Sequence, residues 1–223
     1  MSAFAAVIRK DLRLELRGGQ STIALLAMSM LVLVVLVFAL DAARVRSADT
    51  AAGALWVAMV FSGVVGATRA LSAERENGAI RGLILSPLDP AVLYAAKLAA
   101  AFIFMAVAEA GAVILMVLFF NLEFNASLIR LTPVLMLGAL GFSALATLLS
   151  AATGHTRAGD MLLPILAVPM FVPALIAGVK ASSAALSGAP LASMGDWLRI
   201  MVAFDVLFIT AGYLLFEHVV GED

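Results

Sequence analysis

The stretch TRALSAERENGAIRGLILSPLDPAVLYAAK, residues 68–97, decides how the chain folds, because it is a polar island between two strongly apolar stretches. It holds four of the chain's fourteen Lys and Arg residues, three of its fifteen acids, and two prolines three residues apart. The whole chain is 64% hydrophobic and 13% charged, whereas soluble domains are about 45–50% apolar and about 25% charged. The composition therefore predicts a polytopic membrane protein in which this island is a loop outside the bilayer.

The apolar stretches on either side set the fold class. A helix needs about 20 apolar residues to cross the hydrocarbon core of a bilayer. Six stretches reach or approach that length, at residues 21–40, 51–67, 98–120, 131–152, 161–179 and 197–216. Runs this long favour helices over a β-barrel, whose strands alternate polar and apolar residues over about 10 positions. We expect an all-α polytopic membrane protein with six transmembrane helices in a single domain, residues 1–223.

The distribution of cations orients these helices, because cytoplasmic loops are enriched in Lys and Arg. A cytoplasmic N-terminus would place nine cations inside: Arg9, Lys10, Arg13, Arg17, Arg69, Arg75, Arg81, Lys97 and Arg157. It would leave five outside: Arg44, Arg46, Arg130, Lys180 and Arg199. The bias predicts that the N-terminus, the 68–97 loop and the C-terminus all face the cytoplasm.

The first residues of the chain have an amphipathic pattern. Phe4, Val7, Ile8 and Leu12 share one face of a helix that would stop at two glycines, residues 18 and 19. Basic residues between them would face anionic headgroups, so the pattern predicts an N-terminal amphipathic helix in the interface. The alternative is a cytoplasmic tail that only supplies charges for topology.

Within the loop, the sequence predicts a short helix between two breaks. Glu74 and Glu76 end a charged helix that Gly78 closes, because glycine readily adopts the left-handed conformation after a helix. A short apolar stretch that includes Leu83 and Leu85 follows.

Two prolines then end one helix and begin the next. The pair Ser86-Pro87 breaks the short helix, since proline disfavours helix at the residue before it. Pro90 suits the first turn of a new helix that runs through Lys97 into the third span. A short amphipathic helix at the cytoplasmic surface can occupy a groove on another protein. The alternative is an ordinary loop that lies on the bilayer.

Two acids lie near the middle of expected spans, Glu109 in the third and Asp205 in the sixth. A charge at that depth costs about 2.5–3.5 kcal/mol on insertion scales, so such a residue is a functional candidate. The structural alternative is a protonated carboxyl that bonds to a neighbouring helix or a partner subunit.

The fifth span contains three prolines, Pro164, Pro169 and Pro173. Each removes a backbone donor and crowds the preceding turn, so this helix is expected to bend or break. The bend could flex during transport or outline a lateral opening, or it could be a packed kink without a function.

Several function classes are excluded by the composition. The chain has no cysteine, which removes disulfides and thiolate sites, and its formal net charge of −1 gives no footprint for nucleic acid. It has no Ser/His/Asp set, no H-E-x-x-H motif and no Walker lysine in a Gly-rich loop. We therefore expect a non-enzymatic chain that does not hydrolyse ATP itself.

The loop resembles that of a known superfamily. Residues 74–88, with Glu74, Glu76, Gly78, Leu83, Leu85, Ser86 and Pro87, and then Lys97, are similar to the E-x-E-x-G-x-[IL]-x-x-L-[IL]-x-S-P-[LV] … K pattern of type-2 ABC transporter permeases. That resemblance implies that the loop docks on a cytoplasmic ATPase subunit.

Two further segments resemble one family within it, the haem exporter permeases of cytochrome c maturation, called CcmB. Residues 161–178, MLLPILAVPMFVPALIAG, are similar to its LLPLLxLPLxxPxLIFG motif. Residues 9–17, RKDLRLELR, are similar to its R-D-L-x-L-x-x-R start. This chain departs at residues 81 and 82, Arg-Gly, where the family usually has a polar pair such as Glu-Gln.

The resemblance implies a permease of the bacterial inner membrane that serves haem delivery for c-type cytochromes. Its partners would be the ATPase, other cytochrome c maturation membrane subunits, a periplasmic haem chaperone and the lipid bilayer, with two copies per complex as one possible stoichiometry. Haem would be the transported ligand rather than a tightly bound cofactor, and ATP would act only through the partner. The alternatives are a type-2 permease for a drug, lipid or polysaccharide, and an assembly scaffold that translocates nothing.

Overall fold

The structure is a computed structural model that describes the backbone of residues 4–5, 7–10, 20–42, 48–76, 89–121, 126–154 and 159–221, with most of their side chains. The described part is helical, and it contains no strand. Its elements are α2 (Gln20–Ala42), α3 (Ala48–Glu76), α5 (Pro90–Phe120), α6 (Ala126–Gly154), α7 (Gly159–Leu186), η1 (Leu191–Met194) and α8 (Gly195–Gly221). The all-α prediction is confirmed.

Five described helices are long and apolar enough to cross a membrane. These stretches are Ala48–Ser72, Pro90–Phe120, Ser127–Thr153, Met161–Leu186 and Ala192–Phe216. They coincide with the second to sixth spans expected from the sequence. The expected first span lies on α2, but within the described side chains its apolar stretch, Met30–Ala39, is shorter than a span. The count of six therefore stays a prediction.

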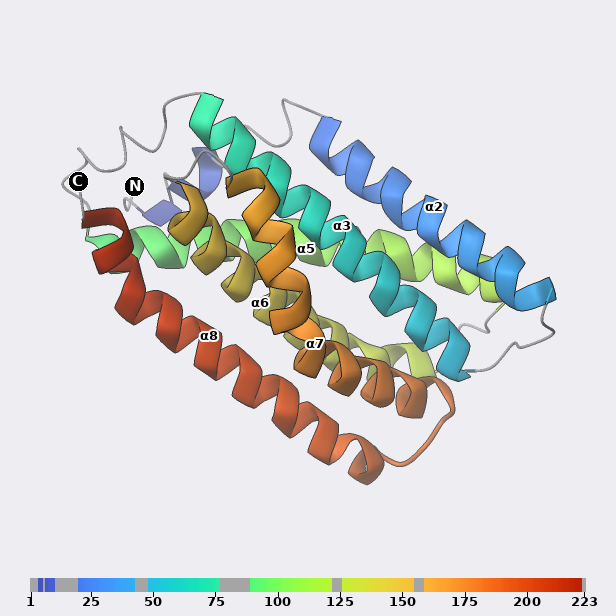
Figure 1. The fold of residues 1–223 in the computed structure, drawn as a ribbon. Helices are drawn as coiled ribbons and strands as arrows, with labels where there is room; N and C mark the ends of the chain where they lie inside the picture. Colours follow the sequence, from blue (N-terminus) through green and yellow to red (C-terminus); the bar gives the residue numbers. More distant parts are fainter. Residues whose placement is uncertain are drawn as a thin grey trace.

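The helices form an elongated bundle in which successive helices run in opposite directions (Figure 1). The two termini, the end of α3 and the start of α5 all lie at the same end of the bundle (Figure 1). The start of α3, the end of α5 and the turn between α7 and α8 lie at the opposite end. Both helix ends that flank the 77–88 segment therefore lie beside the chain termini.

α3 and α6 occupy the centre of the bundle. In the most apolar 18 residues of each helix, 61% of α3 and 72% of α6 are buried, whereas only 33% of α5 and of α7 and 28% of α8 are. Small residues explain how α6 and α7 approach α3, because glycine and alanine let helix backbones come close in a membrane. A Cβ added at Gly63 of α3 would lie 2.6 Å from the Phe142 ring of α6. The outer helices keep apolar side chains on their free faces, as lipid-facing helices do.

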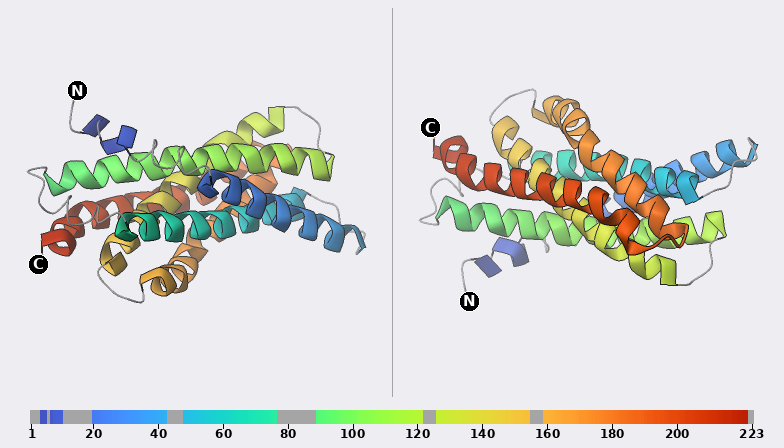
Figure 2. Two further views of the ribbon diagram at one scale, coloured as in Figure 1. Left: turned by 90° about the horizontal axis from the view of Figure 1, so that it is seen from above. Right: turned by 90° about the horizontal axis from the view of Figure 1, so that it is seen from below.

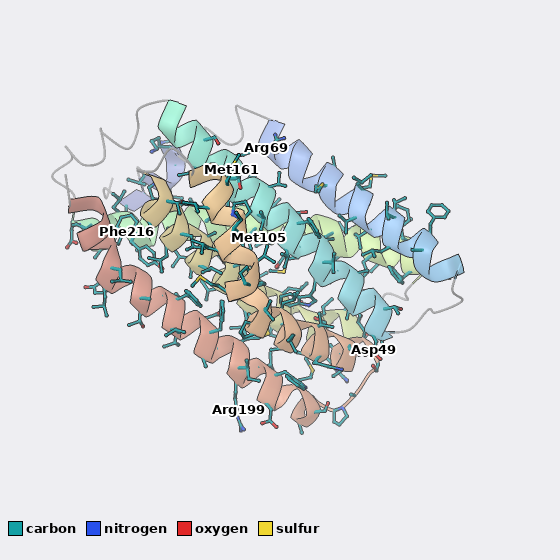
Figure 3. All side chains as sticks on the ribbon, in the orientation of Figure 1. Asp49, Arg69, Met105, Met161, Arg199 and Phe216 are labelled. Atoms are coloured by element: carbon teal, nitrogen blue, oxygen red, sulfur yellow. The ribbon has the colours of Figure 1, made fainter. Side chains whose placement is uncertain are left out.

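Polar contacts hold the end of the bundle where α8 begins. Arg130, in the first turns of α6, donates hydrogen bonds from Nη1 to the carbonyl oxygens of Gly188 at 3.3 Å and Ala189 at 3.1 Å. These bonds fasten the turn between α7 and η1 onto α6. Arg199 points away from the bundle at this end (Figure 3), where it pairs with Asp196 at 3.0 Å.

The N-terminal residues differ from an isolated interfacial helix. Residues 7–10 are helical, and Val7 is buried against the first turns of α5 and the end of α8. Phe4 remains exposed. Part of the apolar face that the sequence assigned to lipid therefore packs on protein. Residues 11–19 lie outside the described residues, so the interfacial position of the whole segment stays a prediction.

Candidate functional site

The helix ends beside the loop hold the described part of the expected ATPase-coupling site. Glu74 and Glu76 lie in the last described turn of α3. Lys97 lies about two turns after the start of α5 at Pro90. The other residues assigned to this site lie outside the described residues: Gly78, Leu83, Leu85, Ser86 and Pro87. The short coupling helix between α3 and α5 therefore stays a prediction.

The start of α5 is built as the sequence indicates. Asp89 is the N-cap, and its Oδ1 accepts a hydrogen bond from the backbone N–H of Ala91 at 2.8 Å. Pro90 occupies the first helical position, where the missing N–H costs no intrahelical bond. The expectation that a new helix begins at Pro90 and continues through Lys97 is confirmed. The helix that leaves the loop thus has a fixed starting point.

The two intramembrane acids are buried on separate helices. Glu109 of α5 is 2% exposed, and Asp205 of α8 is 3% exposed. Neither Glu109 oxygen nor Asp205 Oδ2 has a hydrogen-bond partner in the part of the chain that the structure describes. A buried polar group without a partner is uncommon and calls for an explanation. Among the described residues, these three carboxyl oxygens therefore lack the hydrogen bonds that a purely structural role would use.

Asp205 lies against the backbone of α6. A Cβ added at Gly141 would be 2.4 Å from Asp205 Oδ1 and 3.1 Å from the Phe204 ring. Only glycine at residue 141 leaves room for this carboxyl between α6 and α8. The acid therefore occupies a specific notch, although its Oδ2 gains no partner there.

The three-proline helix remains continuous. α7 runs from Gly159 to Leu186 with Pro164, Pro169 and Pro173 inside it, and its direction changes along its length in Figure 1. Pro169 and Pro173 lie on its exposed face, whereas Phe171 between them is fully buried. Whether the bend has a role in transport stays a prediction.

A cluster that the sequence did not single out lies at the centre of the bundle. Phe171 of α7 contacts three aromatic rings from three other helices, with ring centroids at 6.3 Å from Trp56, 5.2 Å from Phe142 and 5.6 Å from Phe204. Trp56 in turn fits against two glycines, because added Cβ atoms would approach its ring to 2.1 Å at Gly178 and 2.5 Å at Gly138. The sequence places a tryptophan within one span and glycines within two others, but it does not indicate that these residues meet.

The described residues contain no group of three or more His, Asp or Glu side chains placed to hold a metal ion. The candidate site comprises the helix ends beside the loop, the two buried acids and the aromatic cluster around Phe171.

Comparison with known proteins identifies the family to which the sequence belongs. The sequence matches the family described as "CcmB protein" over residues 2–220. The chain belongs to the CcmB family.

Curated relatives in this family extend over most of the chain. A protein named heme exporter protein B from Bradyrhizobium diazoefficiens is 27% identical over 213 residues, which cover 95% of this chain and 94% of the relative. The protein of the same name from Rhodobacter capsulatus is 29% identical, with 78% and 80% of the two chains covered. That from Pseudomonas aeruginosa is 30% identical, with 68% and 67% covered. The CcmB membership expected from the fifth span and the N-terminal motif is thus confirmed.

Proposed function

We propose that this chain is the membrane subunit of an exporter that delivers haem for c-type cytochrome biogenesis. The observation that carries the proposal is the CcmB match over residues 2–220, almost the whole chain. Relatives matched along most of their own length share the name heme exporter protein B. The bundle of long apolar helices suits a subunit that lies almost entirely in the membrane.

In this proposal, residues 1–223 form one transmembrane domain that carries no catalytic residues. Haem is the cargo, and ATP is hydrolysed by a separate cytoplasmic ATPase subunit. Other maturation subunits and a periplasmic haem chaperone complete the complex in the bacterial inner membrane. The common position of the termini, the end of α3 and the start of α5 supports a single cytoplasmic end (Figure 1). The excess of cations predicted for that side supports the same orientation.

The segment of residues 74–87 is proposed to receive the ATPase. Its first acids, Glu74 and Glu76, lie in the last described turn of α3. Negative charge near a helix C-terminus opposes the helix dipole by about 0.3–1 kcal/mol, so these acids do not serve helix stability. Cations on a partner protein would offset that cost and would select the partner by charge. The fixed start of α5 at Asp89 then converts a displacement of the loop into a displacement of α5.

The test is deletion of the gene, followed by haem staining of periplasmic and membrane proteins after denaturing electrophoresis. We expect loss of all covalently bound c-type haem and its return when the wild-type chain is supplied from a plasmid. A matched strain that carries the empty plasmid controls for the deletion itself. Unchanged c-type haem in the deletion strain would contradict the proposed function, and a defect confined to another exported compound would identify a different cargo.

A further inference from the structure

Tyr94 lies where the loop meets the bundle. It follows the start of α5 at Pro90 by four residues, and its side chain is only 2% exposed. Its hydroxyl donates a hydrogen bond to the carbonyl oxygen of Phe208 in α8 at 3.3 Å. Its ring also packs on Phe216 of α8, with centroids 5.4 Å apart. The first turns of α5 are therefore bound to the middle of α8 and to its last turns.

α8 has a notch that accepts this tyrosine. A Cβ added at Gly212 would lie 2.2 Å from both Cζ and Oη of Tyr94. In a regular helix the N–H of residue 212 bonds to the carbonyl of residue 208. The tyrosine hydroxyl thus bonds to the Phe208 carbonyl oxygen, which also accepts the backbone hydrogen bond within the helix. It reaches this oxygen only because residue 212 has no side chain. The fit is specific to a tyrosine opposite a glycine.

The N-terminal residues cover the other side of the same turn. Val7, 8% exposed, belongs to one apolar cluster with Leu93, Tyr94, Ala96 and Phe216. Both views in Figure 2 show the first turns of α5 between the N-terminal helical residues and the end of α8. The labelled Phe216 lies at this end of the bundle in Figure 3. A displacement of the start of α5 therefore has to move α8 or break these contacts.

From α8 the contacts continue into the centre of the bundle. Phe208, whose carbonyl accepts the tyrosine bond, packs on Phe204 with centroids 4.5 Å apart. Phe204 packs in turn on Phe171, and it precedes the buried Asp205. A series of contacts alone does not establish energetic coupling between two sites. It does define where coupling should be measured.

We propose that Tyr94 is a positioning residue that makes α8 move with the start of α5, so that the motion of an ATPase bound at the 77–88 loop reaches the centre of the bundle. This inference rests on the proposed function, in which that loop docks on the ATPase. It assigns Tyr94 a part in transport beyond stabilising the fold. The hydroxyl bond and the Gly212 notch are the two features that carry the assignment.

The chain offers a matched pair of substitutions, because it contains only two tyrosines. Tyr94→Phe removes the bond to Phe208 and keeps the ring, whereas Tyr213→Phe removes a hydroxyl from an exposed side chain of α8, the helix that contains Phe208. The complex with its ATPase is purified and reconstituted into proteoliposomes. ATP hydrolysis and haem delivery to an external acceptor are then measured for each variant, together with the thermal midpoint of the complex.

For Tyr94→Phe we expect full copurification of the ATPase, sustained ATP hydrolysis and about a fivefold drop in haem delivered per ATP, the effect of one neutral hydrogen bond on a two-state ratio. Tyr213→Phe should match the wild type. An unchanged ratio in Tyr94→Phe would overturn the proposal. So would a parallel fall of hydrolysis, delivery and thermal midpoint, which indicates a structural role only. A wild-type complex that delivers no haem would instead contradict the proposed function.

A second measurement does not depend on the cargo. The chain has no cysteine, so Ala95→Cys and Leu214→Cys, both exposed, accept nitroxide labels without background in a complex with a cysteine-free ATPase. Pulsed electron resonance then gives the distance between α5 and α8 with and without bound ATP. We expect one unchanged distance in the wild-type background and an ATP-dependent second distance after Tyr94→Phe. An ATP-dependent distance in the wild-type background would show that the two helices move separately and would overturn the proposal.

Discussion

The indole nitrogen of Trp56 in α3 donates a hydrogen bond to the hydroxyl oxygen of Ser182 in α7 at 2.9 Å. Both side chains are fully buried, and 126 residues of sequence separate them. Asp49, about two helical turns before Trp56, accepts a hydrogen bond from Ser183, the residue directly after Ser182. These two bonds fix the register of α7 against α3 at the end of the bundle opposite the termini. Specific polar contacts thus anchor the bent helix α7 to α3 near its C-terminal end.

Trp56→Phe should destabilise the purified protein in detergent by about 1–3 kcal/mol, because it removes the donor and leaves Ser182 Oγ buried without a partner. The measurement is the thermal midpoint of unfolding. It is monitored with a dye whose fluorescence depends neither on thiols nor on tryptophan. The chain's other tryptophan, the partly buried Trp197, supplies the control. Trp197→Phe should shift the midpoint less than Trp56→Phe, and the reverse order would contradict the anchoring role.

Gly178→Ala should also destabilise the protein, by about 1–3 kcal/mol, because the added methyl would overlap a buried ring that has no room to move. Its Cβ would lie 2.1 Å from Trp56 Cζ2. The comparison is Gly53→Ala on α3, where nothing lies within 4 Å of the added atom. That substitution should be neutral or slightly stabilising, since alanine suits a helix better than glycine. Equal yields and midpoints for the two variants would show that the glycine notch does not matter.

Glu74→Lys together with Glu76→Lys should weaken copurification of the ATPase while the chain remains in the membrane. The reason is that charges at an interface act on partner choice and encounter more than on folding. Asp196→Lys provides the control, because Asp196 is an exposed acid at the opposite end of the bundle. Affinity purification of the tagged chain, with the ATPase quantified by immunoblot, measures the effect. A full complement of ATPase on the double variant, with normal cytochrome assembly, would refute the docking role.

The shared end of the termini and the loop predicts the activity of reporter fusions. Alkaline phosphatase fused after Leu85 should be inactive, because that residue would face the cytoplasm. The same enzyme fused after Ala189, in the turn that Arg130 fastens at the other end, should be active. A green fluorescent protein fused at the two positions should show the opposite pattern. Phosphatase activity at Leu85 would invert the proposed orientation.

Hydropathy predicted which segments are helices but not where they begin and end. Hydropathy alone placed the third span from residue 98, whereas α5 begins at Pro90, where the proline and not the hydropathy predicted the start of a helix. The fifth span was expected to end at 179, whereas α7 continues to Leu186. The extra turns contain Ser182 and Ser183, whose hydrogen bonds to α3 offset their polarity. A window of hydropathy reports the lipid-facing part of a helix and cannot report such bonds.

The sequence likewise predicted some residues of the candidate site and missed others. Glu109 and Asp205 stand out in the sequence because an acid at that depth is costly whatever its neighbours are. Tyr94 and Trp56 do not stand out, since each gains its significance from a glycine on another helix. Those glycines, Gly212 and Gly178, lie more than a hundred positions further along the chain. One sequence without its spatial contacts contains no sign of which glycine faces which ring.

The last prediction concerns the two buried acids. Substitutions at these acids distinguish an effect on stability from an effect on transport. Both Glu109 oxygens lack a partner among the described residues, so Glu109→Met replaces an unsatisfied polar group with an apolar chain of similar length. Removing such a group is expected to be neutral or stabilising, by up to about 1–3 kcal/mol. The amide variants Glu109→Gln and Asp205→Asn keep the shape and should insert and bind the ATPase normally.

The outcome for cytochrome maturation then decides the role of each acid. We expect both amide variants to support covalent c-type haem at wild-type levels, measured by haem staining and normalised to the amount of this chain in the membrane. Gly141→Ala is the companion variant for Asp205, because it crowds the carboxyl's notch without removing the acid. An amide variant that assembles fully yet yields no c-type haem would show that its acid ionises or binds cargo during transport. If Glu109→Met raises the thermal midpoint and abolishes haem delivery, the unpaired acid is kept for function at a cost in stability.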